Sequence, residues 1–167
     1  MGKFKKLLLA SSVMCFSSLG LASGSQAQSD YYGISPFEGF YAGAYVGGML
    51  DPTAVTTVGG MAGVNFVLTD NILAGVEMQG GATLNDPATY DALMLGRVGY
   101  ELNDMTLLYG AAGGGVINNI GSYAIGGGAE IIAIDNVGVR AEALGTGSWG
   151  AGLNASKLTL GAMWYVQ

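Results

Sequence analysis

The sequence of 167 residues contains no histidine, one cysteine and three prolines, and only 11% of its residues are charged. Without histidine, the chain lacks the residue that activates the serine nucleophile of most acyl-transferring hydrolases and that completes many zinc sites. The single cysteine, Cys15, lies in the apolar N-terminal segment. The sequence therefore predicts a protein that is not an enzyme and that holds no metal and no cofactor.

Glycine, in contrast, is abundant, with 30 residues. They follow no three-residue period, which excludes collagen. Each glycine inside a helix costs roughly 1 kcal/mol relative to alanine, so a helical bundle is disfavoured. Half of the residues are hydrophobic, which is too many for a disordered chain. One helical alternative stays open, a surface antigen whose glycine-rich stretch at residues 113–128 forms close-packed helices.

The N-terminus has the pattern of an export signal. Three lysines precede an apolar run at residues 7–22, and Ser25-Gln26-Ala27 supplies small residues where a signal peptidase cleaves. The run is shorter than the roughly 20 apolar residues that a transmembrane helix needs. We therefore predict a signal peptide at 1–27, a periplasmic segment at 28–37 and a barrel domain at 38–167.

The charge balance changes when the predicted signal peptide is removed. The remaining chain keeps all twelve acidic residues but only Arg97, Arg140 and Lys157, which gives a formal net charge of −9. Such an acidic chain is not expected to bind nucleic acid. An export signal combined with an acidic, cysteine-free body predicts location in the bacterial cell envelope.

From Phe40 onward, short segments of alternating polarity are separated by polar turns, which is typical of antiparallel strands. About ten residues is the length of a tilted strand that crosses a bilayer. The pattern predicts eight strands, at residues 40–48, 59–68, 72–83, 92–101, 105–116, 123–133, 137–146 and 157–166.

The alternation also predicts which face of each strand is apolar. In the third predicted strand Val76 and Met78 share one face, and Glu77 shares the other with Gln79. A soluble barrel would bury the apolar faces, but their many alanines and glycines would fill an interior poorly. An inverted arrangement, with small apolar groups outside and charges inside, fits an eight-stranded antiparallel transmembrane β-barrel.

The connections divide into two classes. Residues 69–71, 102–104 and 134–136 form short turns, and each contains aspartate and asparagine. We expect three-residue loops there, with Asn71 and Asn136 in the left-handed region. The other connections, at 49–58, 84–91, 117–122 and 147–156, are longer. Short periplasmic turns and longer outer loops are the topology of an outer-membrane barrel.

Charged residues on the inward faces predict a network in the lumen. Unpaired charges in a confined space are costly, so we expect them to form salt bridges. Paired carboxylates such as Glu130 and Glu142 also occur in glycosidases. The register sets Arg140 directly opposite Glu130, however, which favours charge compensation. The predicted network consists of Glu77, Arg97, Glu130, Arg140 and Glu142.

Aromatic residues near the ends of the predicted strands suggest a girdle at each membrane boundary. With both termini periplasmic, most of them fall near the inner boundary and Trp149 falls near the outer one. The predicted girdle consists of Phe40, Tyr41, Phe66, Tyr100, Trp149, Trp164 and Tyr165.

The segment Gly39-Phe40-Tyr41-Ala42-Gly43-Ala44-Tyr45-Val46-Gly47 resembles the start of small opacity-type outer-membrane proteins, which are similar in architecture to the OmpA membrane domain. The last predicted strand is similar to the terminal signal read by the barrel-assembly machinery, although such chains usually end in an aromatic residue rather than Gln167. The resemblance implies an outer-membrane location, with lipids and lipopolysaccharide around the barrel.

Two functions from different classes fit these features. The first is a structural or narrow porin-like component of the outer membrane, with a charge-paired lumen. The second is a surface adhesin or antigen that acts through its outer loops, which are short for a binding surface.

Overall fold

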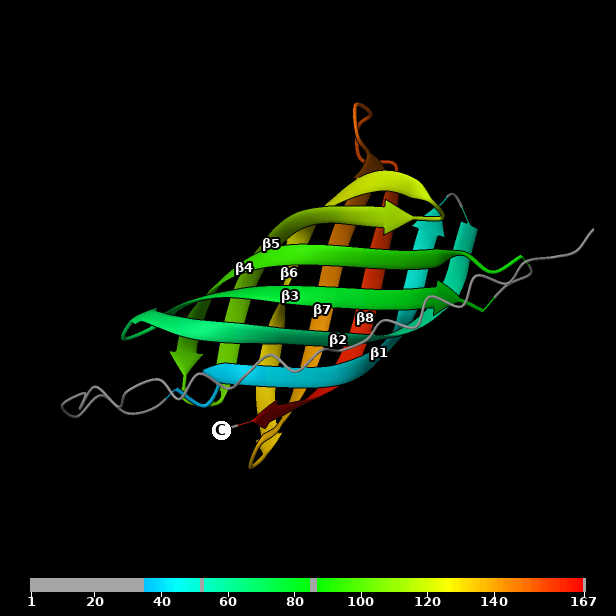
Figure 1. Cartoon of the computed structure of the whole chain (residues 1–167). Helices are drawn as coiled ribbons and strands as arrows, with labels where there is room; N and C mark the ends of the chain where they lie inside the picture. Colours follow the sequence, from blue (N-terminus) through cyan, green and yellow to red (C-terminus); the bar gives the residue numbers. More distant parts are fainter. Residues whose placement is uncertain (1–34, 52, 85–86, 167) are drawn as a thin grey trace, which may run out of the picture. The chain divides into compact units, whose positions relative to one another are not determined.

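The computed structural model describes residues 35–51, 53–84 and 87–166. The predicted signal peptide and residues 28–34 of the predicted periplasmic segment lie outside the described residues. Eight antiparallel strands pair in chain order, and β8 pairs with β1 to close a barrel (Figure 1). This confirms the predicted fold class. The strands are β1 (Gly39–Asp51), β2 (Thr53–Thr69), β3 (Ile72–Thr83), β4 (Tyr90–Asn103), β5 (Thr106–Ile117), β6 (Ile120–Ile134), β7 (Val137–Ser148) and β8 (Ala155–Val166).

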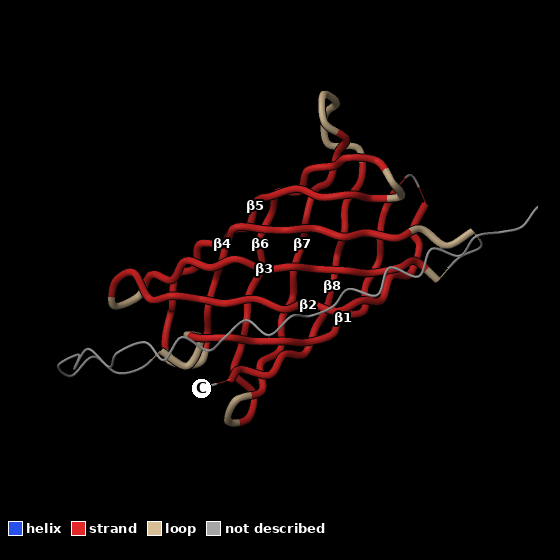
Figure 2. Tube along the Cα trace, viewed as in Figure 1, coloured by secondary structure: helices blue, strands red, loops and turns tan. Residues whose placement is uncertain are grey.

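The barrel has two different ends (Figure 2). The turn end carries the connections β2–β3, β4–β5 and β6–β7, together with the first residue of β1 and the last of β8. The loop end carries the other four connections. Both ends of the barrel chain therefore lie at the turn end, as in the predicted topology.

At the turn end, the three turns are tighter than predicted. Each leaves two residues between its strands, and a register shift lies beside it, between Val67 and Thr69 in the first case. The extra residue is therefore taken up as a β-bulge rather than by a third loop residue. The prediction of left-handed Asn71 and Asn136 is wrong, because the positive φ of 43° at the β6–β7 turn belongs to Asp135.

At the loop end, two predicted loops are mostly strand. Residues 49–58 lie largely in β1 and β2, whose pairing runs to Asp51 and Thr53, since valine and threonine favour extended structure. Residues 117–122 shrink to the turn Asn118-Asn119, with φ of 50° and 63°, which suits a two-residue hairpin. The remaining connections are 84–89 and 149–154.

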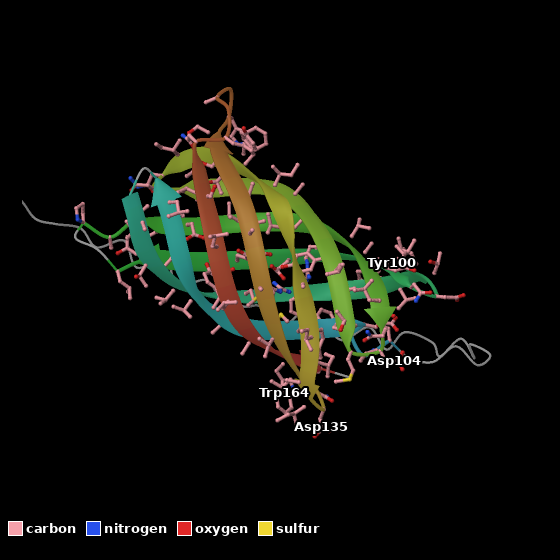
Figure 3. All side chains as sticks on the ribbon, turned by 180° about the vertical axis from the view of Figure 1, so that it is seen from behind. Tyr100, Asp104, Asp135 and Trp164 are labelled. Carbon is pink, nitrogen blue, oxygen red and sulfur yellow. The ribbon has the colours of Figure 1, made fainter. Side chains whose placement is uncertain are left out.

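The alternation of the strands separates two faces as predicted. In β3, Val76 and Met78 are exposed on the outside, whereas Glu77 and Gln79 are buried inside. β4 alternates between exposed and buried residues from Tyr90 to Leu102. Figure 3 shows the outward Tyr100 and Trp164 at the same end as Asp104 and Asp135 of the tight turns. The predicted partners Glu130 and Arg140 are directly opposite each other.

Glycines on the inward face make room for tyrosine rings. A Cβ atom added at Gly63 would lie 2.4 Å from the Tyr41 hydroxyl, and one at Gly59 would lie 2.4 Å from the Tyr45 hydroxyl. Real Cβ atoms do not approach other atoms so closely, so these rings occupy the space that a larger residue would need. The narrow lumen therefore combines large and very small side chains.

The residues before β1 close the turn end. The Phe37 side chain is fully buried and meets the Tyr165 ring edge-on, at 5.9 Å between centroids. Asn65 Nδ2 donates to the Phe37 carbonyl at 2.9 Å. The Ser35 hydroxyl donates to Glu101 Oε1. Residues 35–37 of the predicted periplasmic segment therefore form part of the packed interior.

No helix of the described chain is long and apolar enough to cross a membrane. The glycine-zipper alternative is wrong, because residues 113–128 belong to β5, β6 and the turn between them.

Candidate functional site

The middle of the lumen holds a compact cluster of four charged residues from four strands. Glu77 comes from β3, Arg97 from β4, Glu130 from β6 and Arg140 from β7. Their side chains are at most 2% exposed. The alternation of each strand aims them inward, while hydrophobic neighbours face outward. We name these four residues the charge cluster.

Each carboxylate of the charge cluster contacts both guanidinium groups. Glu77 Oε2 lies 3.1 Å from Arg97 Nη1 and 2.6 Å from Arg140 Nη1. Glu130 Oε1 pairs with Arg97 Nη2 and lies 2.7 Å from Arg140 Nη2. The last contact is an ion pair that lacks hydrogen-bond alignment. Two positive and two negative charges thus neutralise one another, as burial in a confined interior requires.

Three tyrosines surround the charge cluster. The hydroxyls of Tyr41 and Tyr165 donate to Glu77 and Glu130. The Tyr109 ring lies 3.9 Å from the guanidinium carbon of Arg97, within the range of a cation–π interaction. The Nε atoms of Arg97 and Arg140 have no hydrogen-bond partner in the described chain, so the aromatic faces are their main compensation.

The position of Tyr41 and Tyr165 corrects the predicted girdle. Both are buried, at 2% and 0% exposure. Neighbouring residues of a strand point to opposite faces, so Phe40 and Tyr41 cannot both face outward, and neither can Trp164 and Tyr165. The other five predicted girdle residues are exposed: Phe40, Phe66, Tyr100, Trp149 and Trp164.

Glu142, the fifth residue of the predicted network, lies inside without a salt bridge to any described residue. Its carboxylate accepts hydrogen bonds from Tyr109 Oη at 2.7 Å and from Gln79 Nε2 at 2.7 Å. Gln79 Nε2 also donates to Glu77 at 2.8 Å. Glu142 is thus linked to the charge cluster by hydrogen bonds only.

A second ion pair, missed by sequence reasoning, lies nearer the loop end. Lys157 Nζ is 2.7 Å from Asp91 Oδ2 and donates to Tyr45 Oη at 2.8 Å. Asp91 is the last residue of the predicted connection at 84–91. Its even spacing from Arg97 was the available signal, because residues six apart on one strand share a face.

Two of these ion pairs cross the barrel from side to side. Arg140 on β7 reaches Glu77 on β3, and Lys157 on β8 reaches Asp91 on β4. In a closed order of eight, strands four apart lie on opposite sides. The two pairs are therefore cross-braces inside the barrel.

The three basic side chains of the described chain, those of Arg97, Arg140 and Lys157, are all paired with carboxylates. No described group of three His, Cys, Asp or Glu residues is placed to hold a metal ion. The arrangement instead resembles a structural core made of charges and tyrosines.

Comparisons with known proteins bear on the fold alone. No protein-family model and no curated protein matches the chain. One similar solved structure is a designed protein, described as "De novo design of transmembrane beta-barrels". The TM-score is 0.56 at 18% identity, over 77% of this chain and 97% of the design. The chain therefore has the fold of a small transmembrane-type β-barrel.

Proposed function

We propose that the chain is a bacterial outer-membrane β-barrel, exported through its signal peptide, and that it is a structural component with a closed interior. The observation that carries the proposal is the inverted polarity of the barrel. Valine, leucine, methionine and aromatic side chains cover the outside, while the charge cluster is buried. In water this surface would be an extensive apolar patch, whereas in lipid it is the expected one.

The height of the apolar surface supports the proposal. Tyr90 and Tyr100 are both exposed on β4, ten residues apart. At about 3.3 Å per residue and a tilt of about 40°, they are separated by about 25 Å along the barrel axis. This agrees with the apolar band of outer-membrane barrels, about 25 Å tall between its aromatic girdles.

The closed interior favours the structural role over the narrow porin. Ions would have to pass both cross-braces and the apolar residues packed between them. In this proposal the barrel is an opacity-type, OmpA-like protein without enzymatic activity. It contacts lipids and lipopolysaccharide, and the barrel-assembly machinery inserts it.

A matched pair of substitutions tests the membrane location. Met94 and Leu102 face outward on β4 with similar exposure, 59% and 55%. Met94 lies between Tyr90 and Tyr100 on β4, and Leu102 lies beyond Tyr100. In lipid vesicles, Met94→Arg is expected to lower the free energy of unfolding of the barrel by about 2–4 kcal/mol, and Leu102→Arg by about 0–1 kcal/mol. The measurement is urea unfolding followed by tryptophan fluorescence.

A soluble barrel predicts no difference between the two variants, since an arginine at either exposed site would then cost little. Equal, small effects would therefore refute the proposal. Heat-modifiable gel migration of the outer-membrane fraction gives an independent check of the location.

The adhesin alternative has less support, because two of the four expected loops are mostly strand. The 149–154 connection, with exposed Trp149 and Leu153, is the segment to replace in a cell-binding assay. Unchanged adhesion would dismiss that alternative.

A further inference from the structure

A cavity of about 300 Å³ opens at the loop end of the barrel. Its walls come from the loop-end parts of several strands and from three of the connections. The cross-brace of Lys157 and Asp91 lies at the level of Met49 and Ile117, which line the cavity and pair in register with these two residues, but neither charged residue lines the cavity itself.

The lining is polar but uncharged over the residues that the structure describes. Thr83 and Ser122 bond to main-chain oxygens of Thr89 and Ile120. Five further polar side chains have no hydrogen-bond partner in the described chain: Thr89, Asn118, Thr146, Ser148 and Asn154. Apolar groups such as Val55 and Ile120 complete the wall. The cavity thus presents unengaged hydroxyl and amide groups beside apolar surface.

This lining discriminates between classes of ligand. A charged ligand would lose hydration without gaining a counter-charge, because Lys157 and Asp91 are at most 2% exposed and neutralise each other. A purely apolar ligand would cover the free hydroxyls and amides and leave them without partners. A neutral ligand with several hydroxyl groups satisfies both conditions.

We propose that this cavity is a binding site for a small, uncharged polyhydroxylated molecule, of the size of a single sugar ring. The volume lies at the lower end of the range for small-molecule sites, about 300–1,000 Å³. The ligand of the cavity is either a free solute or a sugar of a surrounding glycan.

The test is an NMR titration of the folded full barrel in detergent micelles. Glucose and myo-inositol are the neutral probes, and gluconate and glucosamine are the charged analogues. We expect saturable shifts of cavity-lining amide signals with a neutral probe, and no saturation with the charged ones. Thr146→Val removes a lining hydroxyl and is expected to weaken binding about three- to tenfold.

Thr56→Val is the matched control, because Thr56 is exposed on the outside of β2 and lines no part of the cavity. Its binding is expected to equal that of the wild type. The double variant Ser148→Ala/Asn154→Ala gives a second test at more exposed positions, in case Thr146→Val does not fold. It is expected to weaken binding at least as much as Thr146→Val.

Three results would overturn the proposal: no saturation by either neutral probe, equal binding of a charged analogue, or unchanged affinity in the double variant. A parallel titration with an uncharged oligosaccharide distinguishes the two sources: tighter binding than that of glucose assigns the site to a sugar of a glycan, and weaker binding assigns it to a free solute.

Discussion

Replacing the Arg140 side chain should destabilise the barrel by more than the loss of its packing contacts alone. The guanidinium joins Glu77 and Glu130, and its side chain is 2% exposed. In Arg140→Met the methionine keeps most of the apolar contact but supplies no charge. Two buried carboxylates are then left with Arg97 as their single cation.

The magnitude follows from the cost of an uncompensated buried charge. Breaking a buried ion pair by removing one partner typically costs about 3–5 kcal/mol. We therefore expect Arg140→Met to lower the free energy of unfolding by about that amount. Arg140→Met combined with Glu130→Gln restores neutrality, because Glu77 and Arg97 remain as a pair. The double variant should therefore lose about 1–3 kcal/mol less unfolding free energy than the sum of the losses in the two single variants.

Urea unfolding of the four proteins in lipid vesicles completes this double-mutant cycle. Arg140→Lys serves as a control that keeps the charge but loses the fork that joins two carboxylates, and it should be intermediate. If Arg140→Met stayed within about 0.5 kcal/mol of the wild type, or the two substitutions were additive, the charge cluster would not act as a unit.

Two further predictions concern the interior. Gly63→Ala should destabilise the barrel by about 1–3 kcal/mol, because the new methyl group displaces the Tyr41 ring. Gly60→Ala should not, because its Cβ would lie an ordinary 3.6 Å from the carbonyl oxygen of Gly43; equal effects of the two substitutions in urea unfolding would contradict this explanation. In planar bilayers the wild-type barrel should show no channel events, since the cross-braces of Arg140 and Lys157 close the lumen; regular ion-conducting steps would refute the closed interior.

Much of this architecture could be predicted from the alternation of polar and apolar residues along the chain. The period of two in β3, β4, β7 and β8 predicted the strands, their faces and the inward direction of the charged residues. The opposition of Glu130 and Arg140 followed from an odd number of residues around the β6–β7 turn. That parity was right although its cause was wrong, because a bulge rather than a longer loop supplies the odd residue.

The errors arose where pattern alone does not distinguish two conformations. In residues 53–58, the polarity of the valines and threonines alternates too weakly to show whether the segment is a loop or continues the strand. Phe40 and Tyr41 were both predicted to lie in the girdle because they are near the end of a strand. As neighbours on that strand, however, they must point to opposite faces. Tyr41 became part of the interior, where it bonds Glu77.

The sequence by itself determined the number of strands, their order and the polarity of each face, since these depend on residues close together in the chain. Only the tertiary structure decided which inward residues meet across the barrel. Lys157 and Asp91 are separated by 66 positions and lie on strands four apart. Their contact depends on the closure of the barrel and on the stagger of its strands, which no local pattern records.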